Sequence, residues 1–184
     1  MAPVKQMKLV ILDRDGVINH DSEDYIKSPA EWLPLPGSLE AIADLSSAGI
    51  TVAVATNQSG LARGLFDVDA LNRINSLMNA RVAAIGGRID AIAFCPHGPW
   101  QACDCRKPAP GLLLALSARL NVALEGVPVI GDSMRDLEAA VNVGATPILV
   151  RSGNGDKTAR GLPPALAGIT IVDDLRAAAQ SILS

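Results

Sequence analysis

The chain has 184 residues, a length that suits one domain burying roughly 70% of the surface its unfolded form would expose. Hydrophobic residues make up 49% of it and aromatic residues only 3%, which predicts an aliphatic core and argues against base-stacking platforms for nucleic acid. The net charge of −3 gives the chain no basic field that would attract nucleic acid or membranes. No apolar run approaches the ~20 residues of a membrane span. We therefore expect a soluble, cytoplasmic monomer.

Short β-branched runs alternate with longer helical patterns, which is typical of parallel strands joined by crossover helices. The predicted strands are Lys8–Leu12, Thr51–Ala55, Ile89–Phe94, Val127–Ile130, Pro147–Val150 and Thr170–Val172. The predicted helices lie near Ser38–Ala48, Val68–Ile85, Gly111–Leu120, Arg135–Val143 and Leu175–Ile182. Gly49 stands where a helix C′ residue is expected, and Asp67 where an N-cap is expected. We interpret Arg151–Gly168 as a surface loop, so one α/β domain is expected over residues 1–184.

Polar clusters follow four of the predicted strands. They read Asp13-Arg14-Asp15-Gly16, Thr56-Asn57-Gln58-Ser59-Gly60, Arg106-Lys107-Pro108 and Gly131-Asp132-Ser133-Met134-Arg135-Asp136. Each cluster alone is explained by a turn or a helix cap. Because open parallel sheets bind ligands beyond the carboxyl ends of their strands, four such clusters in strand order predict one shared site.

The carboxylates Asp13, Asp15 and Asp132 are expected at that site, and like charges crowded together require a divalent cation. Carboxylate oxygens with room for water favour Mg²⁺, which in turn attracts a phosphate. Lys107, the Thr56 hydroxyl and the backbone N–H groups that follow it would hold the remaining phosphate charge. We therefore predict phosphoryl transfer, with Asp13 as the nucleophile and Asp15 as the general acid and base.

A second metal site is predicted in the segment that precedes Arg106. Its ligands would be the three cysteines and one of the two histidines of the chain: Cys95, His97, Cys103 and Cys105. Thiolates and imidazole at this spacing suit tetrahedral Zn²⁺, and four protein ligands make the ion structural. The alternatives are buried thiols beside a surface histidine, or a redox pair. Residues two apart rarely meet the required Cβ distance, which argues against a disulfide between Cys103 and Cys105.

The DRDG, TNQSG, RKP and GDSMRD elements resemble the four motifs of the haloacid dehalogenase (HAD) superfamily of aspartate-nucleophile phosphatases, over residues 8 to 150. The resemblance implies a three-layer, Rossmann-like HAD fold with a mostly parallel sheet. It also implies that Asp13 and Asp132 supply carboxylates to Mg²⁺, that Asp15 supplies a main-chain carbonyl, and that Thr56 and Lys107 stabilise the phosphoryl group.

Within the superfamily, the zinc segment joined to RKP, together with TNQSGLARG, is similar to the bacterial heptose-bisphosphate phosphatases of heptose-nucleotide synthesis. This resemblance implies magnesium-dependent hydrolysis of the 7-phosphate of a heptose 1,7-bisphosphate through an aspartyl-phosphate. Histidinol-phosphate phosphatases share the zinc segment but typically carry an acidic residue where Ser59 stands. The chain departs from the pattern in a short spacing between His97 and Cys103, and in Ser133, where some relatives carry lysine.

Only a helix and a strand fit between Gly60 and Cys95, so we expect no cap domain and a pocket walled by the zinc segment and Asn19–Pro36. Arg63 or Arg106 could bind a distal phosphate bidentately, and the alternative for both is solvated surface. The candidate substrate-binding residues are Asp21, Tyr25, Asn57, Gln58, Ser59, Arg63 and Arg106. Asp136, one helical turn after Asp132, would hold a magnesium-bound water or orient Lys107.

Three hypotheses follow. The first is a magnesium-dependent phosphatase of a small sugar bisphosphate, the second a histidinol-phosphate or DNA-end phosphatase, and the third a zinc-stabilised binding module without catalysis. The acidic charge balance and the few aromatic residues count against DNA ends. The complete set of Asp13, Asp15, Thr56, Lys107 and Asp132 counts against an inert module.

Overall fold

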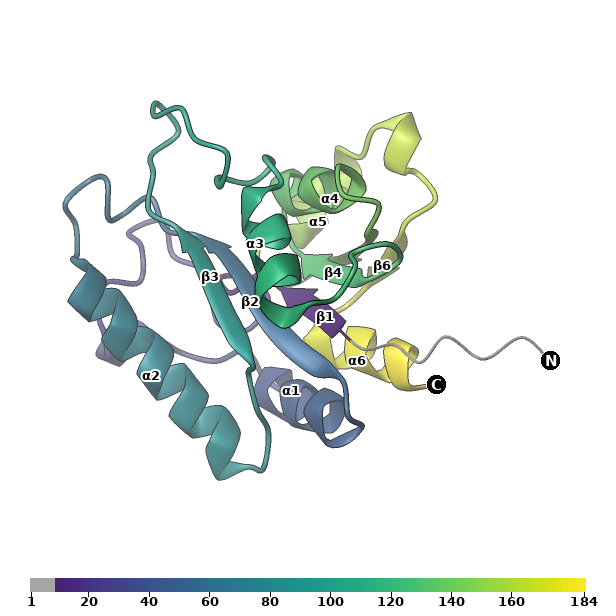
Figure 1. The fold of residues 1–184 in the computed structure, drawn as a ribbon, viewed down its shortest axis with the longest axis horizontal. Helices are drawn as coiled ribbons and strands as arrows, with labels where there is room; N and C mark the ends of the chain where they lie inside the picture. The colour runs from purple at the N-terminus through teal and green to yellow at the C-terminus, as the bar shows by residue number, and fades with distance from the viewer. Residues whose placement is uncertain (1–8) are drawn as a thin grey trace.

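The computed structural model describes residues 9–184, and its centre is a six-stranded sheet in which every pair of neighbours is parallel (Figure 1). The strands are β1 (Leu9–Leu12), β2 (Thr51–Asn57), β3 (Ala91–Cys95), β4 (Pro128–Gly131), β5 (Thr146–Val150) and β6 (Thr170–Val172). Their order is β3-β2-β1-β4-β5-β6. The chain therefore runs outward from β1 to β3, returns, and runs outward again from β4, which places the topological switch point between β1 and β4.

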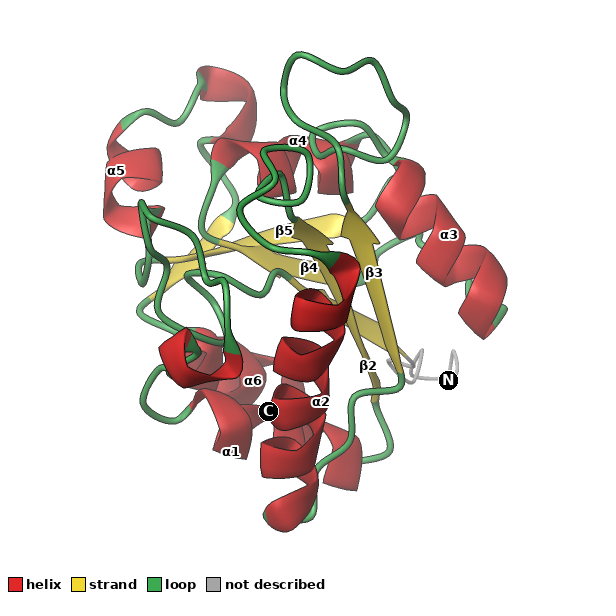
Figure 2. Cartoon of the chain, turned by 90° about the vertical axis from the view of Figure 1, so that its left-hand side faces the viewer, coloured by secondary structure: helices red, strands yellow, loops and turns green. Residues whose placement is uncertain are grey.

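Helices cover both faces of the sheet, as Figures 1 and 2 show. One layer contains α1 (Ser38–Ser47), α2 (Val68–Ala84) and α6 (Leu175–Leu183), and the other contains α3 (Gly111–Leu120), α4 (Met134–Val141) and α5 (Gly155–Arg160). Successive side chains of β1 point to opposite faces of the sheet and so belong to two cores. Val10 and Leu12 pack toward the first layer, while Leu9 and Ile11 pack toward the second. The predicted three-layer α/β fold is confirmed.

Most predicted elements match the structure to within two residues. Lys8, predicted as the start of the first strand, lies outside the described residues. Asp67 caps α2 by accepting a hydrogen bond from the Ala70 N–H at 2.7 Å, and Gly49 after α1 has a φ of +81°. The second strand is longer than predicted, since Thr56 and Asn57 continue the ladder opposite Phe94 and Cys95.

The interpretation of Arg151–Gly168 as a surface loop is wrong. This segment contains α5 and a 3₁₀ helix, Pro164–Leu166, and Leu166 is buried against Leu137 and Leu149. A helix as short as α5 spans too few turns to display a helical hydrophobic period, which explains the error. Between β2 and β3 the described chain contains only loops and α2, with no inserted domain.

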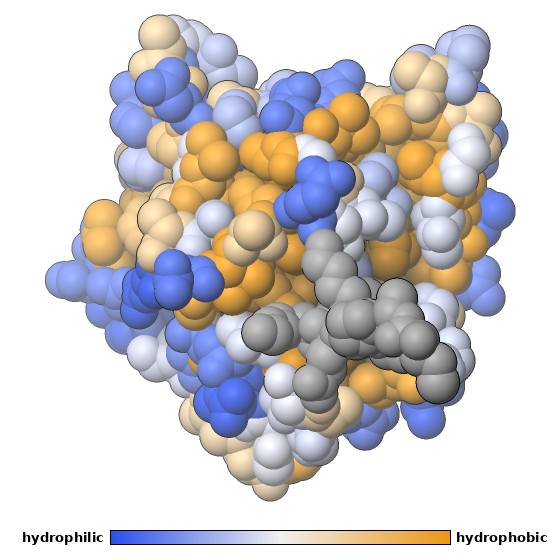
Figure 3. Space-filling view, turned by 45° about the vertical axis from the view of Figure 1, so that its right-hand side comes forward, coloured by the Kyte–Doolittle hydropathy of each residue, from blue (hydrophilic) through white to orange (hydrophobic). Residues whose placement is uncertain are grey.

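The surface drawn in Figure 3 mixes hydrophilic and hydrophobic side chains. Across residues 9–184, no helix is both long enough and apolar enough to span a membrane.

Candidate active site

A cavity of about 380 Å³ opens beyond the carboxyl ends of the central strands, where the loops gather in Figure 2. It is lined by every residue that the sequence predicted for catalysis, substrate binding or magnesium. These are Asp13, Asp15, Asp21, Tyr25, Thr56, Asn57, Gln58, Ser59, Arg63, Arg106, Lys107, Asp132 and Asp136. Clusters far apart in the sequence meet there because parallel strands present their carboxyl ends at one edge of the sheet.

Lys107 is almost fully buried at the floor of this pocket. Its ammonium lies 3.0 Å from Asp13 Oδ1, contacts Asp136 Oδ1, and donates to the Ala55 carbonyl at 2.7 Å. The side-chain amide of Asn57 accepts from the Lys107 N–H and donates to the Lys107 carbonyl, both at 3.1 Å. The Lys107–Pro108 peptide bond is cis. The end of β2 thus fixes the backbone of the lysine as well as its side chain.

Three carboxylates gather at this floor: Asp13, Asp132 and Asp136 offer oxygens that all lie within 4.8 Å of one another, and Asp13 and Asp136 contact the Lys107 ammonium. Burial raises the pKa of Asp13 to about 8, and the other carboxylates of the pocket add to the rise while Lys107 opposes it. Burial also raises the pKa of Asp132 to about 6. One lysine does not balance this much negative charge, and a set of hard carboxylate oxygens fits Mg²⁺.

The loop after β5 holds Asp132 in place. The Asn154 backbone N–H donates to Asp132 Oδ2 at 2.7 Å, its side-chain amide approaches the same oxygen at 3.3 Å, and the Thr158 hydroxyl donates to the Asp132 carbonyl at 2.8 Å. A Cβ on Gly16 or Gly153 would overlap the Asp132 carboxylate, and both glycines have positive φ, +83° and +59°. Only glycine lets the two loops close around this carboxylate.

Asp15 faces a different set of partners. Arg14, which is fully buried, donates from Nε and Nη2 to the two Asp15 carboxylate oxygens at 3.0 Å each. The Asn19 and Gln58 side-chain amides donate to the same carboxylate at 2.9 Å, and Gln58 also donates to the Thr56 hydroxyl at 2.9 Å. The Asp15 side chain is therefore held by donors rather than joining the carboxylates around Lys107.

The four candidate zinc ligands converge in the loop between β3 and α3. Cys95 Sγ lies 3.6 Å from His97 Nδ1, 3.9 Å from Cys103 Sγ and 3.2 Å from Cys105 Sγ, and His97 Nδ1 lies 3.3 Å from Cys105 Sγ. Tetrahedral ligands about 2.0–2.3 Å from a zinc ion stand roughly 3.3–3.8 Å apart. The two separations that involve His97 lie in this range, and the two between sulfur atoms lie just outside it. Burial, together with the neighbouring thiols, raises the pKa of Cys105 to about 12, so a cation is needed to favour its thiolate.

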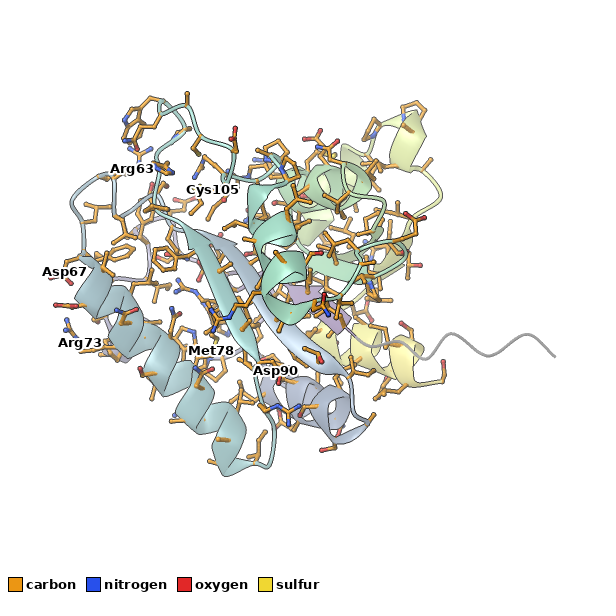
Figure 4. All side chains as sticks on the ribbon, in the orientation of Figure 1. Arg63, Asp67, Arg73, Met78, Asp90 and Cys105 are labelled. Carbon is orange, nitrogen blue, oxygen red and sulfur yellow. The ribbon has the colours of Figure 1, made fainter. Side chains whose placement is uncertain are left out.

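Aromatic rings and arginines form the rim of the pocket. The Arg63 guanidinium lies 4.6 Å from the centre of the Trp100 ring and 5.9 Å from that of Tyr25, within the range of a cation–π contact. Tyr25 adopts a φ of +64°, an uncommon conformation for a bulky residue. Arg106 donates from Nη1 to the His97 carbonyl at 3.1 Å, which ties it to the zinc segment. Figure 4 places Arg63 and Cys105 at the same end of the molecule.

Several residues of the site received no role from the sequence: Arg14, Asn19, Arg135 and Asn154. The sequence did contain a signal for Arg14, since a cation between two acidic residues of one motif is placed to bind either of them. Asn154 follows the fifth strand, whose carboxyl end belongs to the same edge of the sheet, so strand order was the signal for this residue. The contact of Asn19 with Asp15 depends on packing within the loop that follows β1, because Asn19 Oδ1 accepts from the indole N–H of the buried Trp32 at 3.0 Å.

Comparison with known proteins gives a consistent result. A family model described as HAD-hydrolase-like matches residues 104–178. The chain is 54% identical over 179 residues to the D-glycero-beta-D-manno-heptose-1,7-bisphosphate 7-phosphatase of Bordetella bronchiseptica, covering 96% of this chain and 98% of that one. It is 53% identical over 178 residues to the enzyme of that name from Pseudomonas putida, covering 96% and 100%. A crystal structure of D,D-heptose 1,7-bisphosphate phosphatase from B. bronchiseptica, complexed with magnesium and phosphate, matches with a TM-score of 0.91, 54% identity and coverage of 96% and 98%.

Proposed function

The chain belongs to the HAD superfamily and, within it, to the heptose-1,7-bisphosphate 7-phosphatase family, and we propose that it removes the 7-phosphate of D-glycero-D-manno-heptose 1,7-bisphosphate with the help of Mg²⁺. As a member of this family it is an enzyme, a phosphoric monoester hydrolase. The observation that carries the proposal is the contact between Asp13 and the buried Lys107 beside two further carboxylates at the floor of one pocket.

The carboxylates of Asp13 and Asp132, with the main-chain carbonyl of Asp15, would hold the magnesium ion. When bound, this ion would neutralise the negative charge of the phosphate and so allow a carboxylate to approach it. Asp136 contacts Lys107 rather than facing away from it, which supports a role in orienting the lysine. The raised pKa of Asp13 also supports the proposal, because a cation is needed for its ionised form to prevail at neutral pH.

The Asp13 carboxylate would attack the phosphorus and form an aspartyl-phosphate, which divides a slow hydrolysis into two easier steps. Lys107, the Thr56 hydroxyl and backbone N–H groups after it would stabilise the charge on the phosphoryl oxygens. Asp15 would protonate the leaving alkoxide and then deprotonate the water that cleaves the intermediate. The contacts of Gln58 with both Asp15 and Thr56 support this arrangement, since they connect the acid to the phosphate side of the pocket.

We also propose that Cys95, His97, Cys103 and Cys105 bind a structural Zn²⁺. The separations between their ligand atoms support this assignment, and a filled tetrahedral site has no open position for catalysis. The zinc loop leads directly into Arg106 and Lys107, so the ion would act on the reaction by fixing these two side chains.

Binding of the sugar is assigned to the rim. Arg106 would bind the phosphate that is not cleaved, with Arg63 beside it, while Asp21, Tyr25 and Ser59 line the part of the pocket where hydroxyl groups would lie. Asp21 is held by the Asn154 amide at 3.1 Å, which supports a fixed orientation. Both Asn57 amide contacts go to Lys107, so Asn57 would act on the substrate through the lysine.

Phosphate release from a small panel tests this function. The panel contains both anomers of D-glycero-D-manno-heptose 1,7-bisphosphate, fructose 1,6-bisphosphate and histidinol phosphate, each with added Mg²⁺. We expect kcat/KM to be highest for one heptose bisphosphate anomer. A higher kcat/KM for histidinol phosphate would overturn the proposed substrate and leave the phosphatase chemistry standing.

A further inference from the structure

Three arginines line the pocket at its rim: Arg63, Arg106 and Arg135. Within residues 9–184, none of the three forms an ion pair with a carboxylate. Arg63 lies over the Trp100 ring, and Arg106 donates to a backbone carbonyl. Arg135 is exposed in the first turn of α4, and its side chain has no hydrogen-bond partner in the described part of the chain. The catalytic proposal gives Arg135 no role.

Arg106 and Arg135 face the same space. Both line the main pocket and also the smaller cavity that adjoins it beside the zinc segment. Both guanidinium groups are positively charged and line the same two cavities, so they repel one another. Two like charges that share a cavity and form no ion pair are unfavourable, and an anion bound by both offsets the repulsion.

The helix turn that carries Arg135 also reaches the floor of the pocket. Asp136, the next residue, contacts the Lys107 ammonium, and its other carboxylate oxygen accepts hydrogen bonds from the Ser133 N–H and hydroxyl at 3.1 and 2.6 Å. These contacts fix the first turn of α4 relative to the reacting centre. The backbone of Arg135 thus belongs to a rigid turn beside the phosphate-binding floor, and its side chain lines the same pocket, which favours a ligand with two separated anionic groups.

We propose that Arg135 joins Arg106 in binding the phosphate that is not cleaved, and that this pair gives the enzyme its preference for a bisphosphate over a monophosphate. The inference rests on the proposed function in one respect: the phosphate that is cleaved binds at the floor of the pocket. It adds a specificity-determining residue that belongs to α4 rather than to the zinc loop.

The first test compares Arg135→Gln with the wild-type enzyme on heptose 1,7-bisphosphate and on heptose 7-phosphate, which lacks the distal phosphate. We expect the preference for the bisphosphate, measured as the ratio of the two kcat/KM values, to fall by about tenfold, chiefly through KM, the usual effect of losing a hydrogen bond to a charged group. Arg160→Gln, at the exposed end of α5, changes the net charge equally and should leave the ratio unchanged. An unchanged ratio in Arg135→Gln overturns the inference.

The second test measures binding without turnover. Mannose 1-phosphate, which carries only a phosphate on carbon 1, is titrated into wild type, Arg135→Gln, Arg106→Gln and the double variant by calorimetry. If both arginines bind one phosphate, each single variant should weaken binding about tenfold, and the double variant should lose less than the product of the single losses. Strictly multiplicative losses, or wild-type affinity in Arg135→Gln, would contradict the pair. If the wild type released no phosphate from the bisphosphate, the proposed function would fall, and this titration would still decide the role of the two arginines.

Discussion

The Asp13 carboxylate and the Lys107 ammonium lie 3.0 Å apart, although Asp13 follows β1 and Lys107 follows the zinc loop after β3. Asp136 contacts the same ammonium from the first turn of α4. Burial alone would lower the pKa of Lys107, but Asp13 and Asp136 raise it above its usual range, so the lysine stays charged. One buried cation thus joins three separate segments of the chain, and its loss should affect stability as well as turnover.

Lys107→Met should destabilise the protein as well as abolish turnover. Removing one partner of a buried charge cluster leaves the others uncompensated, at a cost of about 3–5 kcal/mol in the free energy of unfolding. The loss should be largest near pH 9, where Asp13 is ionised, and smaller near pH 5, where Asp13 holds a proton. Urea unfolding at both pH values measures it, and Lys157→Met on the exposed surface of α5 is the control.

Asp13→Asn should retain the fold and the zinc and lose all measurable turnover, because a carboxamide cannot form the aspartyl-phosphate. Asp15→Asn should be severely slowed for another reason, the loss of proton transfer, and should accumulate the phosphorylated enzyme. Mass spectrometry after acid quenching would detect one added phosphoryl group. Asp44→Asn, at an exposed position of α1, should behave as wild type. Substantial activity in Asp13→Asn would mean that water attacks the phosphate directly.

The stability of the magnesium-free protein should fall as pH rises. The pKa of Asp13 is about 8 in the folded protein and near 4 when unfolded, so its stabilising contribution is complete below about pH 4 and is lost as pH rises through about 8. Asp132, with a pKa of about 6, should also lower the stability as pH rises, over a lower pH range. Mg²⁺ should bind more tightly at the higher pH and release protons on binding. Thermal unfolding with and without Mg²⁺, and calorimetry in buffers of different ionisation enthalpy, check both statements; stability that rises over this range would refute them.

The two metals should differ in how tightly the protein holds them and in whether turnover requires their addition. Metal analysis of protein purified without chelators should find about one zinc per chain, while turnover should require added Mg²⁺ and not added Zn²⁺. Cys105→Ser should lower both stability and activity, since it loosens Arg106 and Lys107. Brief treatment with EDTA that spares the zinc should be reversed by Mg²⁺ alone. Protein without zinc that remains fully folded and active would remove the structural role of the ion.

Asn154→Ala should weaken magnesium binding. The substitution keeps the backbone N–H bond to Asp132 and removes the side-chain amide that lies between Asp132 and Asp21. Loss of a residue that orients a metal ligand typically costs tenfold or more in affinity, and we expect about tenfold here. Titration of Mn²⁺ followed by electron paramagnetic resonance gives the affinity directly. Asn79→Ala, exposed on α2, should leave it unchanged, and an unaltered affinity in Asn154→Ala would show that the backbone contact suffices.

The sequence predicted what depends on local pattern. The predicted helix Gly111–Leu120 begins and ends at the same residues as α3, because its apolar spacing and its flanking residues agree. The extra length of β2 was not predictable, since Thr56 and Asn57 become strand residues only through pairing with Phe94 and Cys95. The catalytic and metal-binding candidates of the pocket were predictable from strand order. The contacts of Asn57 with Lys107 and of Asn154 with Asp132 were not, because they arise from tertiary packing between segments with no shared motif.

The two tryptophans near this pocket differ in their exposure to solvent. Trp32 is 2% exposed and donates to Asn19, which in turn donates to Asp15, whereas Trp100 is 59% exposed and lies against Arg63 at the rim. The molecule therefore contains two tryptophan fluorophores, one sensing the packing behind Asp15 and one sensing the entrance. A Trp32→Phe variant would leave the emission of Trp100 as a direct optical readout of ligands arriving at the arginines, with no label attached.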